Sequence, residues 1–399
     1  MYPLKGIKVI EIVGLAAGPF AGMVLADFGA DVIRVDKLSP AISMDVLTRH
    51  KRSISIDFKH PQGYQLVKRL ICTADVLIDT FRPGVMEKLK LGPERMCKEN
   101  DKLIYARISG FGQSGERGKY SKTAGHDINY IAVSGILSML GRQNEKPTFP
   151  LNLLADFAGG SMMCVLGVLL ALLHRNKTGK GQVVDAGMTQ GISYISTFPY
   201  LLKQANLNFV NPRGKNVLDG GAHFYEVYET KDGKYMAVGA LEPQFYETLV
   251  VLLNLSPETL PEQYDESSWP QMKALFTSVF LSKTRAEWCE IFDGKDACVT
   301  PVIEIEEGVT IPPVPAPILS VTPALCAKRD GPNNDGGCAD GIRKHNETTA
   351  EELVLPLGRD SKSILKELGY TDEEIDEFVN NGVVGIATEE NEDNLKSKL

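Results

Sequence analysis

The regular alternation of short apolar runs with amphipathic stretches in the first half of the chain constrains its fold most. An apolar run at residues 7–13 is typical of a buried strand, and a turn rich in glycine, alanine and proline separates it from a helix expected over 19–28. Further strands are expected at 32–35, 53–57, 75–79 and 103–108, with a helix at 61–72. Strands that alternate with helices indicate a parallel, Rossmann-like α/β sheet.

The pattern changes in the second half of the chain. Residues 224–240 resemble a β-hairpin with Asp232-Gly233 at its turn, and amphipathic helices follow at 242–254, 269–281 and 284–292. We therefore expect a smaller α+β domain beside the large one. The expected limits are 1–190 for the large domain, 191–221 for a linker, 222–320 for the small domain, 321–350 for a linker and loop, and 351–399 for a C-terminal helical segment, centred on 359–380, that returns to the large domain.

Charge and cysteine content exclude several classes of protein. The net charge of −8 gives no basic excess that would draw the molecule to nucleic acid or to an anionic membrane. An acidic protein that binds a polyphosphate must instead gather a few lysines or arginines locally. The seven cysteines are odd in number and form no Cys-x-x-Cys pair, which favours reduced thiols over a disulfide framework or a zinc site.

One apolar stretch, at residues 151–173, raises the question of a membrane span. A span needs about 20 uninterrupted apolar residues, and this stretch contains Asn152 and Asp156. We expect a buried core helix that starts near Gly159 and leaves the aspartate close to its N-terminal end. No membrane insertion is expected.

The two ends of the chain carry different targeting information. The N-terminal residues lack a basic region followed by an apolar one, so no signal peptide is expected. The last residues are Ser397, Lys398 and Leu399, the tripeptide that the peroxisomal import receptor recognises. The sequence therefore predicts a peroxisomal protein with that receptor as a partner, and leaves a second, mitochondrial destination open.

The turn after the first strand invites comparison with dinucleotide-binding proteins. Its glycines, Gly14, Gly18 and Gly22, are spaced by four and do not form G-x-G-x-x-G, although Asp36 occupies the place of a ribose-binding acid. The spacing disfavours NAD. Other glycine-containing turns, at 81–84 and 109–115, place binding loops at one edge of the sheet.

Three acidic or basic side chains are candidates for chemistry. His126 follows a glycine and precedes an expected helix start, which Asp127 is able to cap and whose N–H groups can stabilise an oxyanion. Asp156 lies in an apolar run, where burial is costly without partners. Glu242 lies at a strand-to-helix junction. The alternatives are a structural histidine, an N-cap aspartate and a capping glutamate.

Several longer runs resemble one family together. They are GHDINY, PLNLLADFAGG, GKGQVVDAGM, RGKNVLDGGA, VGALEPQFY and DACVTPV, and the match extends from Leu4 to about Val302. The chain resembles the α-methylacyl-CoA racemases of the family III CoA-transferase group. The resemblance implies an interlocked homodimer, with each active site between the large domain of one subunit and the small domain of the other.

The resemblance also assigns residues. It implies that His126 and Asp156 flank the α-carbon of an acyl-CoA, with Asn152 and Glu242 in support. It implies that CoA, which is part of the substrate rather than a separate cofactor, is held by Lys37, Ile56, Asp57, Phe58, Lys59, Lys88, Gly125, Asp127, Ile128, Asn129 and Tyr130. No metal is expected.

The implied reaction fits these residue types. A racemase of this family interconverts the (2R) and (2S) epimers of 2-methylacyl-CoA thioesters through an enolate-like intermediate, and so feeds peroxisomal β-oxidation of branched fatty acids or bile-acid intermediates. Inversion needs one acid–base group on each face of the stereocentre, which a histidine and a buried aspartate supply. The alternative is a CoA-transferase with Asp156 as nucleophile, which has little use for His126.

The chain departs from the family pattern in places. It has Gly358-Arg359-Asp360-Ser361 where the family commonly has Gly-Glu-His-Thr, it is shorter after Glu307, and residues 328–350 match nothing in the family. These departures do not touch His126 or Asp156. They leave the preferred acyl chain unpredicted.

Deleting Ser397 to Leu399 tests the targeting prediction. The truncated protein should keep its fold and activity while moving from peroxisomes to the cytosol, because only the receptor address is lost. Microscopy of tagged full-length and truncated chains measures this. Continued import of the truncated chain in cells that lack the full-length protein would show that the tripeptide is not the signal.

Overall fold

The computed structural model describes residues 2–12, 14, 16–38, 45–113, 118–307, 313–325 and 354–387. The chain divides into two compact units. The first comprises Met1–Ser134, Leu151–Ile195 and Thr310–Leu399, and the second comprises Gly135–Pro150 and Ser196–Val309. The domain limits expected from the sequence stay predictions, because compactness alone does not define an independently folding domain.

A seven-stranded sheet forms the centre of the first unit. Its strands are β1 (Lys8–Ile12), β2 (Asp31–Asp36), β3 (Lys51–Ile56), β4 (Val76–Asp79), β5 (Ile104–Ser109), β6 (Val183–Gly187) and β10 (Val384–Gly385). Their order is β10-β3-β2-β1-β4-β5-β6, with β1 to β6 parallel and β10 antiparallel to β3. The prediction of a parallel α/β sheet is confirmed. Strand order reverses between β1 and β4, where ligands bind in sheets of this type.

Helices surround this sheet. They are α1 (Ala17–Asp27), α2 (Pro61–Cys72), α3 (Val85–Lys88), α4 (Pro93–Glu99), α5 (Asp127–Ser134), α6 (Met163–Thr178) and α7 (Met188–Ile195), with a short 3₁₀ turn at Gly118–Tyr120. The N-terminus of α2 shows why the sequence folds locally in this way: the His60 side chain accepts the N–H of Gln62, and Pro61 occupies the first turn.

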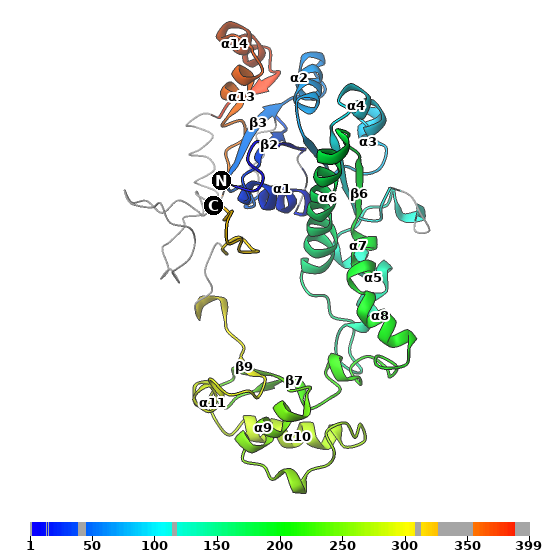
Figure 1. The fold of residues 1–399 in the computed structure, drawn as a ribbon, viewed down its shortest axis with the longest axis vertical. Helices are drawn as coiled ribbons and strands as arrows, with labels where there is room; N and C mark the ends of the chain where they lie inside the picture. The colour runs from blue at the N-terminus through cyan, green and yellow to red at the C-terminus, as the bar shows by residue number, and fades with distance from the viewer. Residues whose placement is uncertain are drawn as a thin grey trace, which may run out of the picture. The chain divides into compact units, whose positions relative to one another are not determined.

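The C-terminal segment folds against β3 (Figure 1). The single helical piece expected over 359–380 is wrong in detail, because two helices form, α13 (Ser361–Glu367) and α14 (Asp372–Asn380). Gly369 takes a φ of +88° after the first helix, a backbone conformation that favours glycine. Thr371 then starts the second helix with a capping box.

The apolar stretch at 151–173 differs from expectation. The helix begins with a π-helical segment, η3 (Leu153–Met162), and continues as α6, so it starts well before Gly159. One face, including Val168 and Ala171, is buried in the unit, whereas Leu166, Leu169, Leu170 and Leu173 are exposed. The combined helix is long and apolar enough to cross a membrane by length and composition, with 44% of its most apolar window buried. The expected start near Gly159 is therefore wrong, and the expected burial holds for one face of the helix only.

The second unit contains a three-stranded antiparallel sheet of β7 (Tyr225–Glu229), β8 (Tyr235–Gly239) and β9 (Val299–Pro301). Its helices are α8 (Thr197–Gln204), α9 (Pro243–Leu252), α10 (Trp269–Phe280) and α11 (Arg285–Phe292), with 3₁₀ turns at Ile136–Met139, Val217–Asp219, Pro257–Thr259 and Ile305–Glu307. The predicted hairpin and the three amphipathic helices are confirmed, and Gly233 has a φ of +72° at the turn.

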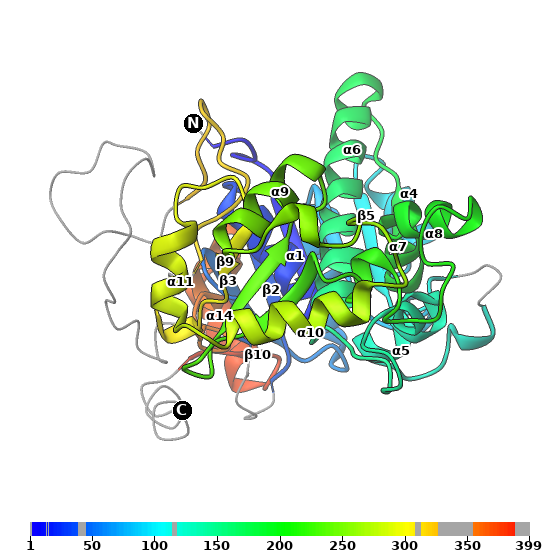
Figure 2. The ribbon, with the colours of Figure 1, turned by 90° about the horizontal axis from the view of Figure 1, so that it is seen from below.

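The core of the second unit lies between this sheet and helices α9, α10 and α11 (Figure 2). Phe276, Phe280 and Trp288 are fully buried there. His223 is also fully buried beside Phe276 and hydrogen-bonds through Nε2 to the Tyr246 hydroxyl at 2.8 Å. Burial lowers the pKa of His223 to about 4, so the ring is neutral at physiological pH and serves packing rather than proton transfer.

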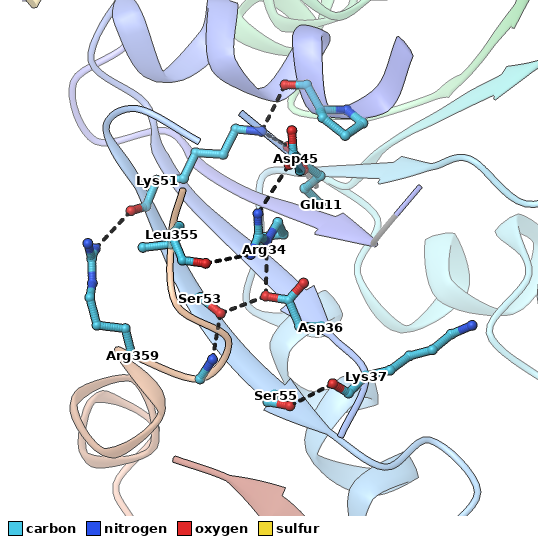
Figure 3. A network of polar contacts seen from close by, with 12 residues as sticks. Glu11, Arg34, Asp36, Lys37, Asp45, Lys51, Ser53, Ser55, Leu355 and Arg359 are labelled. Carbon is cyan, nitrogen blue, oxygen red and sulfur yellow. Dashed lines mark hydrogen bonds and ion pairs between the residues drawn. The ribbon is translucent and has the colours of Figure 1, made fainter. Parts of the chain in front are cut away.

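A buried polar network crosses the centre of the first unit (Figure 3). The Lys51 ammonium donates to Glu11 at 2.7 Å and to the Pro19 carbonyl at 2.8 Å, and neither side chain of the ion pair is exposed. Arg34 donates to Asp36 at 2.9 Å, and Asp36 accepts the hydroxyl of Ser53 at 2.6 Å. Three adjacent strands are joined in this way by charge-assisted hydrogen bonds.

The same network holds the C-terminal segment (Figure 3). Arg34 donates to the Leu355 carbonyl at 3.2 Å, and the N–H of Gly358 donates to the Ser53 hydroxyl at 2.8 Å. Asp360 accepts the N–H of Ser53 at 2.9 Å. The stretch in which the chain departs from the family pattern therefore serves to dock the C-terminal helices on β3.

Replacing Lys51 with Met tests the importance of the buried ion pair. The free energy of unfolding should fall by about 3–5 kcal/mol, because the buried Glu11 carboxylate and the Pro19 carbonyl both lose their donor. Urea unfolding followed by far-ultraviolet circular dichroism measures this. Tryptophan fluorescence is less suitable, since Trp269 and Trp288 both belong to the second unit.

The double variant Glu11→Leu/Lys51→Met is the matched control. It removes both charges and should recover most of the lost stability. If the single and double variants lose the same free energy of unfolding, the unpaired charge of Glu11 is not the cause of the instability.

Candidate active site

The candidate site is built from loops and helix starts that follow the carboxyl ends of the strands. Parallel pairing brings the ends of β1, β4 and β5 to one edge of the sheet. At the point of strand reversal, a Cβ on Gly14 would lie 2.1 Å from the Thr80 hydroxyl, and one on Gly18 would lie 2.2 Å from the Thr80 methyl. These glycines allow close packing of the first turn on the end of β4.

Asp36, the candidate for a ribose-binding acid, has another role. Its side chain is buried and already paired with Arg34 and Ser53. The carboxylate is therefore not available to a dinucleotide ribose, which agrees with the unfavourable glycine spacing.

His126 lies on the loop that leads into α5, and its side chain is exposed. Its backbone N–H donates to the Asn129 side chain at 3.0 Å, and its carbonyl accepts the N–H groups of Asn129 at 2.8 Å and Tyr130 at 3.2 Å. The Tyr130 hydroxyl donates to the Gly125 carbonyl. The loop is thus fixed by its own residues, and none of the described residues forms a hydrogen bond with the exposed imidazole.

Asp156 lies within the π-helical segment and is half-buried. Its carboxylate accepts a hydrogen bond from the Asn152 amide at 3.3 Å. That Asn152 supports catalysis stays a prediction. Burial raises the pKa of Asp156, and the Asp127 carboxylate raises it further, while Asn152 and the charge of protonated His126 lower it. A carboxyl group whose pKa is raised keeps its proton to a higher pH than an exposed aspartate does.

Asp127 joins the two candidate segments. Its side chain is 3% exposed, and one oxygen accepts the backbone N–H groups of Ala155 at 2.6 Å and Asp156 at 2.8 Å. Asp127 therefore caps the helix that carries Asp156 rather than its own helix. His126 and Asp156, which are distant in the sequence, are brought to the same place through this carboxylate.

Glycines behind Asp156 let the π-helical segment pack closely. A Cβ on Gly191 of α7 would lie 1.9 Å from the carbonyl oxygen of Gly159, so only glycine fits this contact. The Ser161 hydroxyl contacts the carbonyls of Asp156 at 2.8 Å and Ala17 at 2.7 Å. The apolar Ala-Asp-Phe-Ala-Gly-Gly run is thus explained by close backbone packing that fixes the aspartate.

The candidate CoA-binding residues from the first half of the chain divide into two groups. Lys37 follows β2, Lys59 follows β3 and Lys88 ends α3, and all three side chains are exposed. Ile56 is fully buried and Phe58 packs on the core, so their side chains serve the fold. Asp57 accepts the N–H of Lys59 at 2.9 Å and shapes the turn.

Glu242 belongs to the second unit and occupies the N-cap position of α9. Its side chain is exposed and makes no capping hydrogen bond. The alternative of a capping glutamate is therefore wrong, and the carboxylate is available for another role.

One residue near the site was not singled out from the sequence. Arg82 is exposed on the turn after β4, and its charge lowers the pKa of the Tyr130 hydroxyl, which burial raises above its usual value. The arginine therefore lies close to the loop that carries His126. The glycine-containing turn at 81–84 was the signal that could have identified it.

Within the described residues, no group of three or more His, Cys, Asp and Glu side chains could hold a metal ion. Cys72, Cys97, Cys164, Cys289 and Cys298 are free thiols. That the reaction needs no cofactor stays a prediction.

Comparison with known proteins defines the class. The model of CoA-transferase family III matches residues 4–319, and the chain belongs to this family. It is 50% identical to "Alpha-methylacyl-CoA racemase" of Mus musculus over 89% of this chain and 97% of the relative, and 48% identical to the Homo sapiens protein of the same name over 93% and 95%. A CAIB/BAIF family protein from Brucella suis shares the fold, with a TM-score of 0.72 at 24% identity over 92% of this chain and 99% of that one.

Replacing Lys37, Lys59 and Lys88 singly with Ala tests the CoA-binding assignment. Each variant should raise KM for an acyl-CoA by about 2- to 30-fold with little change in kcat, because exposed charge contacts contribute to binding rather than to the chemical step. Steady-state kinetics measure both constants. Lys180→Ala, which removes an exposed lysine at the opposite edge of the sheet, is the control. A large fall in kcat at constant KM would contradict the assignment.

Proposed function

We propose that this protein is an α-methylacyl-CoA racemase, an isomerase that interconverts the (2R) and (2S) epimers of 2-methylacyl-CoA thioesters. One observation carries the proposal: a single buried carboxylate, Asp127, holds the segments of His126 and Asp156 together. The identity of 50% and 48% to two proteins named for this activity, over most of the chain, supports it.

The two bases divide the chemistry between them. His126 removes the α-proton from one face while Asp156 delivers a proton to the other, and the reverse reaction exchanges their roles. The raised pKa of Asp156 suits it to hold a proton before transfer. Each turnover breaks the α-carbon–hydrogen bond and the O–H bond of Asp156, and it leaves His126 protonated and Asp156 ionised. The pair must then exchange protons with water before it can process the same epimer again.

The intermediate is enolate-like and carries negative charge on the thioester oxygen. The first turn of α5 begins directly after His126, and the initial N–H groups of a helix have no partner within it. Such N–H groups stabilise an oxyanion without reorganisation. The proposed contribution of the Gly125 to Tyr130 loop is therefore binding of the thioester by backbone atoms.

Lysines at the carboxyl edge of the sheet supply the positive charge that CoA needs. The chain as a whole carries a net charge of −8, so attraction of the CoA phosphates must be local. The exposed side chains of Lys37, Lys59 and Lys88 meet this requirement, and Arg82 adds a fourth cation near the His126 loop.

The active protein is proposed to be a homodimer in which Glu242 of the partner subunit completes the site. Leu166, Leu169, Leu170 and Leu173 form an exposed apolar row on α6, which a second copy would cover. In the second unit, the exposed face of the β7–β8 hairpin borders a pocket of about 660 Å³ lined by Tyr225 and Val227. Glu242 follows β8, and its carboxylate makes no capping hydrogen bond.

The proposed place of the enzyme is the peroxisome, where it would feed β-oxidation of branched fatty acids or bile-acid intermediates. Ser397, Lys398 and Leu399 support this through the import receptor, and they lie outside the described residues, as do residues 328–350. The preferred acyl chain is left open.

The second candidate function is CoA transfer with Asp156 as nucleophile, through a mixed anhydride. Membership of CoA-transferase family III favours it. The free imidazole of His126 beside Asp156 favours the racemase, because inversion requires a second acid–base group and acyl transfer to an aspartate does not.

Isotope exchange with each epimer tests the mechanism. His126→Ala and Asp156→Asn should each lower racemisation by orders of magnitude, since one of the two bases is missing. The remaining base should still exchange the α-proton of one epimer in deuterated water, a different epimer for each variant. Mass spectrometry and chiral separation of the acyl-CoA measure both outcomes.

A CoA-transferase would behave differently. Asp156→Asn would be inactive, His126→Ala would keep near-normal activity, and CoA would move to an acceptor acid. That pattern would overturn the two-base proposal.

A further inference from the structure

The carboxylate of Asp127 has no role in the proposed proton exchange, yet it links the segments that carry the two bases. One of its oxygens accepts the N–H groups of Ala155 and Asp156, at 2.6 Å and 2.8 Å. Both donors belong to the first turn of the π-helical segment, where the helix itself supplies no acceptor. Asp127 also follows His126 directly in the chain, so one side chain contacts the backbone of one base and is covalently adjacent to the other.

We propose that Asp127 is a positioning residue that sets the distance and direction between His126 and Asp156. This inference rests on the proposed racemase function. It assigns the Asp127 side chain to the enzyme's own backbone rather than to CoA, and leaves only its backbone N–H to the substrate. A displacement of about 1 Å between a base and the reacting carbon lowers the rate of the chemical step strongly. A contact that fixes the positions of both bases therefore supports catalysis.

Burial supports this role. The Asp127 side chain is 3% exposed, and its second oxygen, Oδ1, is buried with no hydrogen-bond partner among the described residues. The opposite end of the segment is held independently, by the Ser161 hydroxyl on the carbonyls of Asp156 and Ala17. Asp127 therefore holds the start of the segment, while Ser161 and the glycine contact hold its end.

The negative charge of Asp127 also acts on Asp156. The groups that face Asp156 are Asp127, whose charge raises its pKa, and His126 and Asn152, which lower it. Tyr130 lies in the same cluster and has the charge of Arg82 near it. Loss of the Asp127 charge removes the raising contribution and makes Asp156 easier to ionise.

Two substitutions separate position from charge. In Asp127→Asn the amide oxygen can still accept both N–H groups, and the amide nitrogen takes the place of the unpartnered Oδ1, so the contacts remain while the charge is lost. Asp127→Ala removes both. We expect kcat/KM for racemisation to fall by about 100-fold in the Ala variant, and by less than about tenfold in the Asn variant.

The pH profile provides a readout that general instability would not give. In the Asn variant the acid limb of kcat/KM against pH should move to lower pH, because the His126–Asp156 pair then loses its first proton more easily. The matched control is Asp75→Asn. Asp75 is another carboxylate of the first unit that accepts a backbone N–H, from Lys8 at 2.7 Å, but it lies at the opposite edge of the sheet. Its acid limb should match that of the unchanged protein.

Three results would overturn the inference: wild-type kcat/KM in a folded Ala variant, equal losses in the Asn and Ala variants, or an unmoved acid limb in the Asn variant. If the Ala variant does not fold, the inference is tested by the pH at which the acid limb of the Asn variant lies. Failure of the proposed function is recognised separately, because the unchanged protein would then neither exchange the α-proton nor racemise either epimer.

Discussion

Parallel pairing of β1 to β6 is the constraint on which the rest of the first unit depends. Because the strands run in the same direction, each connection must return the chain to the end of the sheet where the next strand begins. The segments that directly follow the strands therefore all lie at the carboxyl edge of the sheet. The buried pair of Glu11 and Lys51 and the contacts of Arg34 fasten β1, β2 and β3 to one another and to the C-terminal segment. The loops at the carboxyl edge therefore extend from strands that are joined by buried polar contacts.

The sequence of each segment that contributes to the candidate site is compatible with more than one role. A histidine after glycine, an aspartate in an apolar run and a glutamate before a helix each have ordinary structural explanations. The structure adds one contact that the segments alone do not predict: the Asp127 carboxylate accepts the first N–H groups of the segment that carries Asp156. This contact supports the proposal that His126 and Asp156 act as a pair. The chain also belongs to CoA-transferase family III.

Much of the fold could be predicted from the sequence, since the periods of apolar residues in β1 to β5 and in the β7–β8 hairpin are clear. The early start of the helix at Leu153 could not be predicted, because π-helical hydrogen bonding has no apolar period of its own. The N–H of Ala155 in its first turn is accepted by Asp127, which lies 28 residues earlier in the chain. The resemblance supplies His126, Asp156 and Asn152 as candidates, and their roles stay predictions. The buried state of Ile56 and the true capping target of Asp127 required tertiary contacts.

The contact between Gly159 and Gly191 has a consequence for inherited variation. Two backbones touch there, behind Asp156, with no room for a methyl group. An alanine at Gly191 would push on the helix that carries the aspartate, while every residue that meets the substrate stayed unchanged. A variant of this kind would look harmless in any survey confined to the residues around the bound acyl-CoA, and would nonetheless impair the enzyme from the far side of the helix.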